Sequence, residues 1–101
     1  MGRGFVAIAE LEVRLPGSAT LKDRRSALAR LRSGLGERFG ASVAEVGDRD
    51  MPSRGALLVA VVQQTQAGCD ELFDRLQGWL DEGEVEVGIV QTRSVTPGDL
   101  E

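Results

Sequence analysis

The 101-residue sequence contains no histidine, tyrosine or asparagine, and it has a single cysteine and a single tryptophan. Without histidine, the chain cannot form a Ser-His-Asp or Cys-His catalytic arrangement, and it has no imidazole for a metal site. It also lacks the usual general base near neutral pH. One cysteine excludes an internal disulfide and a thiolate cage around a metal ion. We therefore expect no enzyme, with no catalytic residue, metal site or cofactor.

Hydrophobic segments in the sequence are short. The longest apolar run covers residues 56–62, far below the length that spans a bilayer. The first residues show no secretory signal, and position 6 is Val6 rather than the Ser or Thr of a myristoylation signal. With 42% hydrophobic and 28% charged residues, the composition is that of an ordinary globular domain. We expect a cytoplasmic protein without a membrane partner.

The distribution of apolar residues predicts one α+β domain. Four segments have strand character, because apolar residues alternate or occupy both faces: residues 5–15, 42–46, 56–64 and 85–95. Two segments have apolar residues at helical spacing: residues 21–39 and the segment between Thr65 and Glu82. The order β-α-β-β-α-β is that of the ferredoxin-like sandwich, a four-stranded antiparallel sheet with two helices on one face. We expect this domain to cover residues 1–96, followed by a short C-terminal tail at 97–101.

The two predicted helices have defined ends and apolar faces. Thr20 is placed to cap the first helix, with Asp23 as its capping-box partner, and Gly40 can end it. The apolar face of this helix consists of Leu21, Leu28, Leu31, Leu35 and Phe39. The face of the second helix consists of Cys69, Leu72, Phe73, Leu76 and Leu80, with Trp79 on its flank. We interpret Cys69 as a core residue and Trp79 as a packing residue, with an anchor for a partner protein as the alternative for Trp79.

Two separated motifs resemble those of a known family. Residues 15–25 read LPGSATLKDRR, and residues 42–48 read SVAEVGD ahead of an apolar strand. A leucine-proline-glycine turn, a helix that starts Ser-Leu-Lys-x-Lys-Arg and a Ser-Val-Ala-Glu-Val-Gly strand are typical of the YlxP-like proteins, a bacterial family of unknown function. The resemblance extends over roughly residues 6–90. The sequence departs from the pattern at Thr20, where the family has serine, and in DMPSRG at 50–55, where the family loop carries an aromatic residue.

The resemblance implies a small ferredoxin-like domain. It also implies an association with translation, because genes of this family neighbour genes for translation initiation and ribosome maturation. Such a neighbourhood indicates a setting for the protein and no mechanism.

Positive charge is concentrated in the first half of an acidic chain. Residues 1–54 contain ten Arg and Lys against seven Asp and Glu, whereas residues 55–101 contain two against nine. Lys22, Arg24 and Arg25 fall in the first turns of the first helix, where the helix macrodipole disfavours cations. A bound anion would compensate for this unfavourable placement.

We therefore predict an anion site at the start of the first helix. Free backbone N–H groups together with Lys22 and Arg25 would hold a phosphate below the Pro16–Gly17 turn. Arg32 extends this cationic stripe, and Arg24 flanks the apolar face of the helix. Because no Walker motif is present, a phosphate of the RNA backbone fits better than a nucleotide. The alternative is that the cations are solvated or pair with the acidic second helix, which would contribute little to stability.

The uncovered face of the predicted sheet carries a different set of side chains. The outward positions are Val6, Ile8, Glu10, Glu12, Glu45, Glu86 and Val90. None of them is aromatic, so this face cannot stack RNA bases, and its carboxylates would repel phosphate. Val6 and Ile8 form an apolar patch that we predict to mediate self-association. Glu10, Glu12 and Glu45 could alternatively hold Mg²⁺ or act as an acid/base pair in a hydrolase, although such carboxylates more often solvate a surface.

These observations predict a small accessory protein associated with RNA or the ribosome, binding the phosphate backbone through the basic helix start. DNA is not expected as a partner. The alternative function is a dimeric protein-interaction or regulatory module that binds no nucleic acid. A carboxylate-dependent hydrolase is the third and weakest hypothesis.

Overall fold

The computed structural model describes residues 3–17, 19–47 and 51–100 of the chain. Within these residues the elements are β1 (Phe5–Arg14), α1 (Leu21–Phe39), β2 (Ser42–Val46), β3 (Arg54–Gln63), α2 (Gln66–Asp81), β4 (Glu86–Val95) and a 3₁₀ helix, η1 (Pro97–Leu100). The order β-α-β-β-α-β confirms the predicted fold class. Ser18 and Asp48 of the two sequence motifs, Asp50 of the departing loop and Glu101 of the tail lie outside the described residues.

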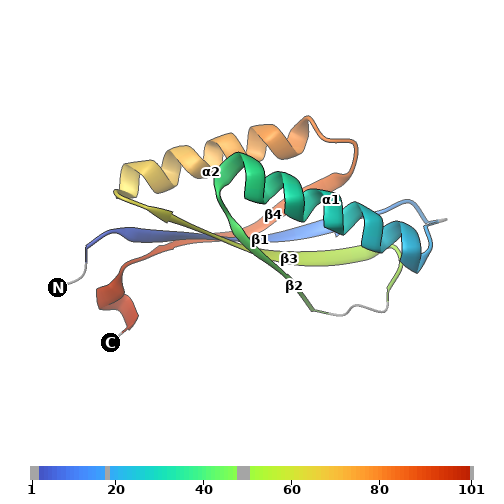
Figure 1. The fold of residues 1–101 in the computed structure, drawn as a ribbon, viewed down its shortest axis with the longest axis horizontal. Coiled ribbons are helices and arrows are strands. Elements are labelled where there is room, and N and C mark those ends of the chain that lie inside the picture. The colour runs from blue at the N-terminus through green and yellow to red at the C-terminus, as the bar shows by residue number, and fades with distance from the viewer. Residues whose placement is uncertain (1–2, 18, 48–50, 101) are drawn as a thin grey trace.

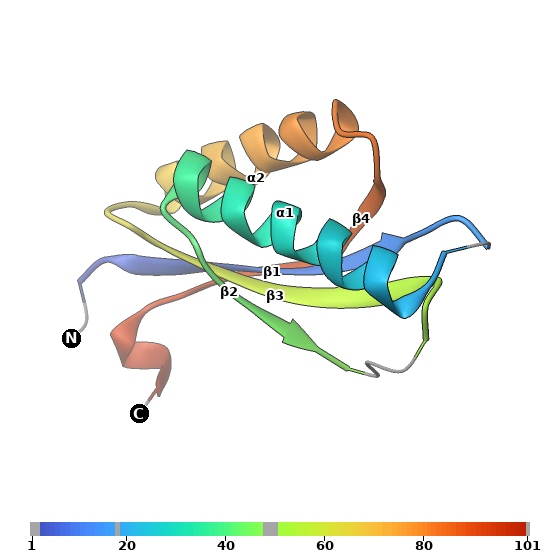
Figure 2. The same cartoon turned by 45° about the vertical axis from the view of Figure 1, so that its right-hand side comes forward.

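The sheet has the strand order β2-β3-β1-β4, and all three pairings are antiparallel. The central strands β1 and β3 pair along their whole length, from Phe5 opposite Gln63 to Arg14 opposite Arg54. α1 and α2 both lie over the same face of this sheet (Figure 1), as predicted. In the turned view, β2 forms the near edge, and neither α1 nor α2 lies on the opposite face (Figure 2).

The hydrophobic core fills the space between the sheet and the helices. In β1, every second residue from Ala7 to Val13 is buried, as the alternation of the sequence predicts. The helices contribute the buried side chains of Leu28, Leu35, Cys69, Leu72, Leu76 and Leu80. Burying such side chains is the main stabilising term, about 25 cal/mol per Å² of apolar surface. Leu21 does not join this core, because its side chain is 42% exposed at the first residue of α1.

The caps expected from the sequence are present. The Thr20 side chain accepts a hydrogen bond from the Asp23 backbone N–H at 3.1 Å, and the Asp23 carboxylate accepts one from the Thr20 N–H at 3.1 Å. α1 ends at Gly40, whose φ of 65° places it in the left-handed region that favours glycine. Thr65 caps α2 by accepting a hydrogen bond from the Gly68 N–H at 3.0 Å.

α1 and α2 run in opposite directions and separate toward the N-terminal end of α1 (Figure 1). They are held together where Trp79 of α2 meets the C-terminal half of α1. The rings of Trp79 and Phe39 pack edge to face, with centroids 5.8 Å apart, and the Arg75 guanidinium lies 5.5 Å from the Phe39 ring centroid. Trp79 is thus a packing residue, as predicted.

The predicted C-terminal tail contains the 3₁₀ helix η1. Asp99 accepts a hydrogen bond from the Thr96 N–H at 2.8 Å, and its own N–H donates to the Thr96 carbonyl at 3.0 Å, which closes the turn of η1. In the part of the chain that the structure describes, neither long helix is long and apolar enough to cross a membrane.

Candidate functional site

Of the four residues in the predicted anion site, the structure exposes three and buries Arg24. Lys22, Arg25 and Arg32 are exposed on α1. No described carboxylate lies within 4.0 Å of any of the three, since the ion pairs between described residues are Arg14–Glu12 and Arg24–Glu45. None of these pairs joins α1 to α2, so the alternative that the cations pair with the acidic helix is not observed among the described residues. Lys22, Arg25 and Arg32 are therefore exposed on α1 and have no ion-pair partner among the described residues.

Arg24 does not belong to this surface. Its side chain is only 2% exposed, and its Nε donates a hydrogen bond to the Arg54 carbonyl at 2.8 Å. A guanidinium nitrogen of Arg24 lies 2.5 Å from a carboxylate oxygen of Glu45, as an ion pair without hydrogen-bond geometry. The prediction that Arg24 contributes to the anion site is corrected, because position 24 lies one turn before Leu28 on the face that packs against the sheet.

The prediction that Glu45 lies on the open face of the sheet is also wrong. In the register of β2, Glu45 lies opposite Leu57, which is fully buried under the helices. Its carboxylate therefore points toward α1 and pairs with Arg24, away from Glu10 and Glu12 on the open face. Among the described residues, no group of three or more potential ligands is placed to hold a metal ion. The acidic trio considered from the sequence is not brought together.

The start of α1 already contains an anion. The carboxylate of Asp23 sits in the first turn, and the Asp23 N–H is bonded to Thr20, so the capping box itself offsets part of the unfavourable placement of the cations. Neither Lys22 nor Arg25 lines the groove beside Pro16, whose charged lining residues are Arg14, Asp23, Arg30, Glu84 and Glu86. A phosphate that met the cations would lie on the other side of α1, where Arg32 borders a shallow groove against β2.

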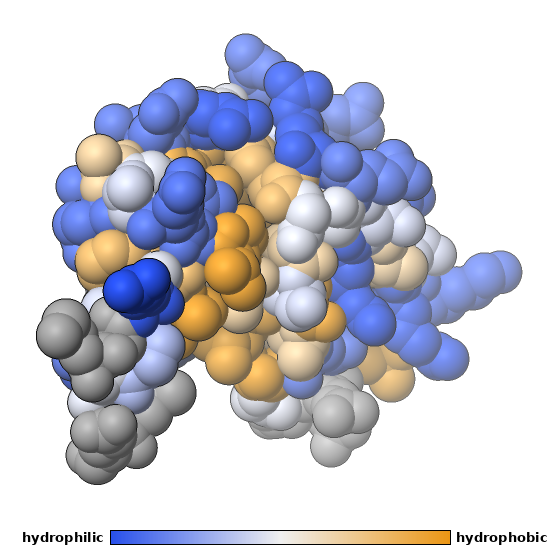
Figure 3. Space-filling view, turned by 60° about the vertical axis from the view of Figure 1, so that its left-hand side comes forward, coloured by the Kyte–Doolittle hydropathy of each residue, from blue (hydrophilic) through white to orange (hydrophobic). Residues whose placement is uncertain are grey.

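The open face of the sheet carries more apolar residues than the predicted patch of Val6 and Ile8. Val6 lies between Val62 of β3 and Val95 of β4, and Ile8 lies opposite Ala60. Val62 is 79% exposed. The apolar residues on this face, which we call the apolar band, are Val6, Ile8, Ala44, Val46, Ala56, Leu58, Ala60, Val62 and Val95. A space-filling view shows apolar surface gathered in the middle and bordered by hydrophilic residues (Figure 3).

The contribution of β3 to the apolar band was missed. Residues 56–62 are apolar on both faces, a pattern that is typical of a central strand. The strand is central, but one of its two apolar faces lies opposite α1 and α2, and Leu58 on this face is 41% exposed. Because both predicted helices lie on one face of the sheet, the apolar run at 56–62 already implies apolar side chains on the uncovered face.

Charged groups of both signs border the apolar band. Glu10 and Glu12 follow Ile8 along β1, and Arg93 of β4 lies opposite Ile8. Arg14 pairs with Glu12 through an Nε–Oε1 contact of 3.4 Å. The band therefore has unlike charges at its margins.

The aromatic residues and the cysteine lie elsewhere. Phe5, Phe39, Phe73 and Trp79 all pack against the core on the helix-covered side. None of these four aromatic side chains is therefore placed to stack a base on the open face. Cys69 is a fully buried free thiol, in agreement with its interpretation as a core residue.

Comparison with known proteins bears on the family. A family model described as a protein of unknown function (DUF503) matches residues 6–94, which reach from β1 to β4 and include the segments 15–25 and 42–48. Curated proteins give no match to the chain. The chain therefore belongs to the DUF503 family of YlxP-like proteins, whose function is unknown.

Proposed function

We propose that this protein is a non-enzymatic interaction module that associates with a second copy of itself through the apolar band. The observation that carries the proposal is the exposure of Val62 and Leu58, at 79% and 41%, on the sheet face opposite α1 and α2. Contiguous apolar surface of this kind is typical of interfaces. Its burial stabilises a complex by about 25 cal/mol per Å².

A second copy is the occupant that the charges favour. In a two-fold dimer the same surface is used twice, so it must be complementary to itself. In such a dimer the apolar bands of the two copies pack against each other. The margins of each band carry both carboxylates, such as Glu10, and guanidinium groups, such as Arg93. Rotation of one copy by 180° can therefore oppose unlike charges around a buried apolar centre. A partner of one charge sign would leave half of these groups opposed to like charge.

Light scattering coupled to size exclusion tests this proposal. We expect the wild type to be a dimer and the Val62→Lys variant to be a monomer, because the new ammonium group would be buried in the interface. Ala29→Lys adds the same charge on the exposed surface of α1 and serves as the matched control, which should remain a dimer. A wild-type protein that is monomeric at high concentration would overturn the proposal.

We also propose RNA binding through α1 as a second function, with the ribosome as one possible source of the RNA. It is favoured by the exposure of Lys22, Arg25 and Arg32 without a described acid within 4.0 Å. These cations would contact phosphates and carry no sequence specificity. Since α1 lies on the helix-covered side, a dimer formed through the open face leaves the three cations accessible (Figure 1). The two functions are therefore compatible in a cytoplasmic accessory protein.

A further inference from the structure

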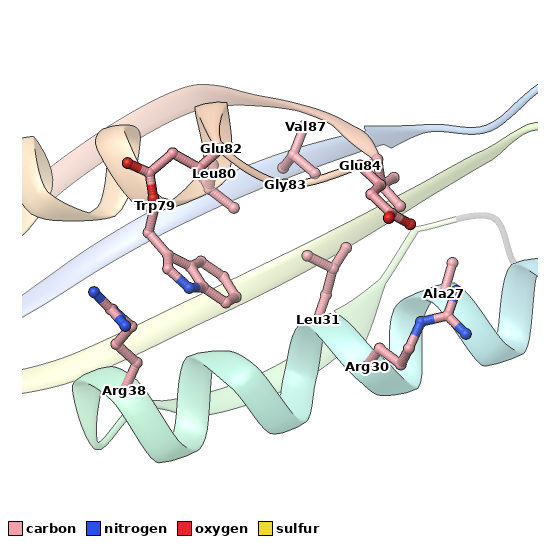
Figure 4. Close-up of a pocket in the computed structure, with 11 residues that line it drawn as sticks. Ala27, Arg30, Leu31, Arg38, Trp79, Leu80, Glu82, Gly83, Glu84 and Val87 are labelled. Atoms are coloured by element: carbon pink, nitrogen blue, oxygen red, sulfur yellow. The ribbon is translucent and has the colours of Figure 1, made fainter.

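A groove of 390 Å³ lies between α1 and the turn that connects α2 to β4 (Figure 4). Its floor is apolar and is formed by the buried side chains of Ala27, Leu80 and Val87. Leu31 and Trp79 are half-buried and form its walls, and both side chains point into it in the close-up. The volume is at the lower end of the range for small-molecule sites, about 300–1,000 Å³.

The groove exists because the two helices touch at only one end. Trp79 packs on Gly34 and Phe39, so α1 and α2 approach closely there. Beyond that contact α1 continues toward its N-terminus, whereas α2 ends at Asp81 and the chain turns back into β4. The apolar side chains beneath this opening are therefore left without a covering element in the described part of the chain.

Charges of opposite sign face each other at one end of the groove. Arg30 projects from α1, and Glu84 projects from the turn before β4, on the opposite wall (Figure 4). Both side chains are exposed, and no ion pair within 4.0 Å joins them. The ion pairs between described residues are Arg14–Glu12 and Arg24–Glu45. A guanidinium and a carboxylate thus border an apolar opening and remain available to a ligand.

We infer that this groove binds a small zwitterion with an apolar body, of the class of apolar α-amino acids. The carboxylate of such a ligand would pair with Arg30 and its ammonium group with Glu84, while its side chain would lie against Leu31 and Trp79. The groove is lined by two guanidinium groups and two carboxylates, from Arg30, Arg38, Glu82 and Glu84, so a ligand that carries both charges matches it better than a phosphorylated one. A purely apolar ligand would leave both charged groups without a role.

Binding should be weak, because both charged groups are exposed to solvent. Titration of the ¹⁵N-labelled protein with L-leucine, followed by amide chemical shifts, tests the inference. We expect saturable shifts at residues 27–31 and 82–87, with a dissociation constant in the millimolar range. N-acetyl-L-leucine lacks the ammonium group and L-leucinamide lacks the carboxylate, so each should bind about three- to fivefold more weakly.

Two variants locate the site. Glu84→Gln should weaken leucine binding about three- to fivefold, and Arg30→Gln should do the same. Arg25→Gln removes the same charge from the same helix outside the groove and should leave binding unchanged. Absence of saturable shifts with leucine, or equal binding of leucine and its N-acetyl form, would overturn the inference. The groove is on the helix-covered side, so the oligomeric state of the protein, measured separately, tests only the proposed dimer.

Discussion

The indole ring of Trp79 occupies the space that a Cβ atom on Gly34 would need. A Cβ built at Gly34 would lie 2.7 Å from two ring carbons of Trp79, closer than any ordinary contact. Glycine in the middle of a helix is normally unfavourable by about 1 kcal/mol relative to alanine. At position 34 this disadvantage is offset, because the missing side chain lets α2 pack directly on the backbone of α1.

Gly34→Ala should therefore destabilise the protein despite the higher helix propensity of alanine. Overpacking costs about 1–3 kcal/mol, and the propensity gain recovers about 1 kcal/mol, so we expect a net loss of about 1 kcal/mol in the free energy of unfolding. Urea denaturation followed by circular dichroism measures the change.

Gly78→Ala is the matched control for this substitution. It lies within α2, and a Cβ there would meet no heavy atom within 4 Å, so it should stabilise the protein by about 0.5–1 kcal/mol. Equal stabilisation by both substitutions would show that Trp79 does not pack on Gly34.

The ion pair between Arg24 and Glu45 connects α1 to β2, and its two residues should be energetically coupled. Glu45→Gln removes the charge that faces a buried guanidinium, and we expect it to lower the free energy of unfolding by about 2 kcal/mol. Arg24→Met leaves the carboxylate of Glu45 without this partner at a site that is only 17% exposed, with a cost of similar size.

A double-mutant cycle separates the pair from its surroundings. The double variant Arg24→Met, Glu45→Gln should lose about 1–2 kcal/mol less than the sum of the single variants, since both members of the ion pair are then removed together. Additivity of the two single effects would contradict the coupling and assign the losses to packing.

The β-α-β-β-α-β order could be predicted because each element carries its own period and its own boundary. Residues of β1 alternate in polarity, and Thr20, Gly40 and Thr65 mark helix ends through hydrogen bonds within a few residues. Information of this kind is local. It places strands and helices without knowledge of what they pack against.

Arg24 and Glu45 could not be placed in this way, because the burial of each depends on the other. An arginine beside an apolar stripe is usually exposed, and its burial here depends on partners from other elements, the Glu45 carboxylate and the Arg54 carbonyl. One signal was available, since Arg24 and Leu28 are four residues apart on the same face. The groove at Arg30 and Glu84 likewise depends on how the helices diverge, which no single segment encodes.

Dimerisation through the apolar band should make thermal stability depend on protein concentration. Association of folded copies stabilises the native state by mass action, so the wild-type Tm should rise when the protein concentration is raised. Val6→Lys places an ammonium group between Val62 and Val95, and its Tm should be independent of concentration. Calorimetry at several concentrations provides the measurement. A wild-type Tm that does not move with concentration would contradict self-association.

RNA binding by α1 should weaken as salt concentration rises, and the steepness of this dependence gives the number of phosphate contacts. If Lys22, Arg25 and Arg32 each meet one phosphate of a single strand, the logarithm of the association constant should fall with the logarithm of salt concentration with a slope of about −2, from about −0.7 per contact. Fluorescence anisotropy of labelled single-stranded RNA gives this slope. Binding should be similar for unrelated sequences, because phosphate contacts carry no base information.

Two double variants with equal loss of charge distinguish a local site from general attraction. Lys22→Ala with Arg25→Ala should reduce the slope to about −0.7, because one contact remains. Arg30→Ala with Arg38→Ala removes two cations that line the groove on the α2 side of the helix, and the slope should stay near −2. Neither pair contributes to the core formed by Leu28 and Leu35, so both proteins should remain folded.

If both double variants weaken binding equally, the RNA responds to the overall charge of the first half of the chain. The three cations would then form no site, and the open face of the sheet would remain as the functional surface.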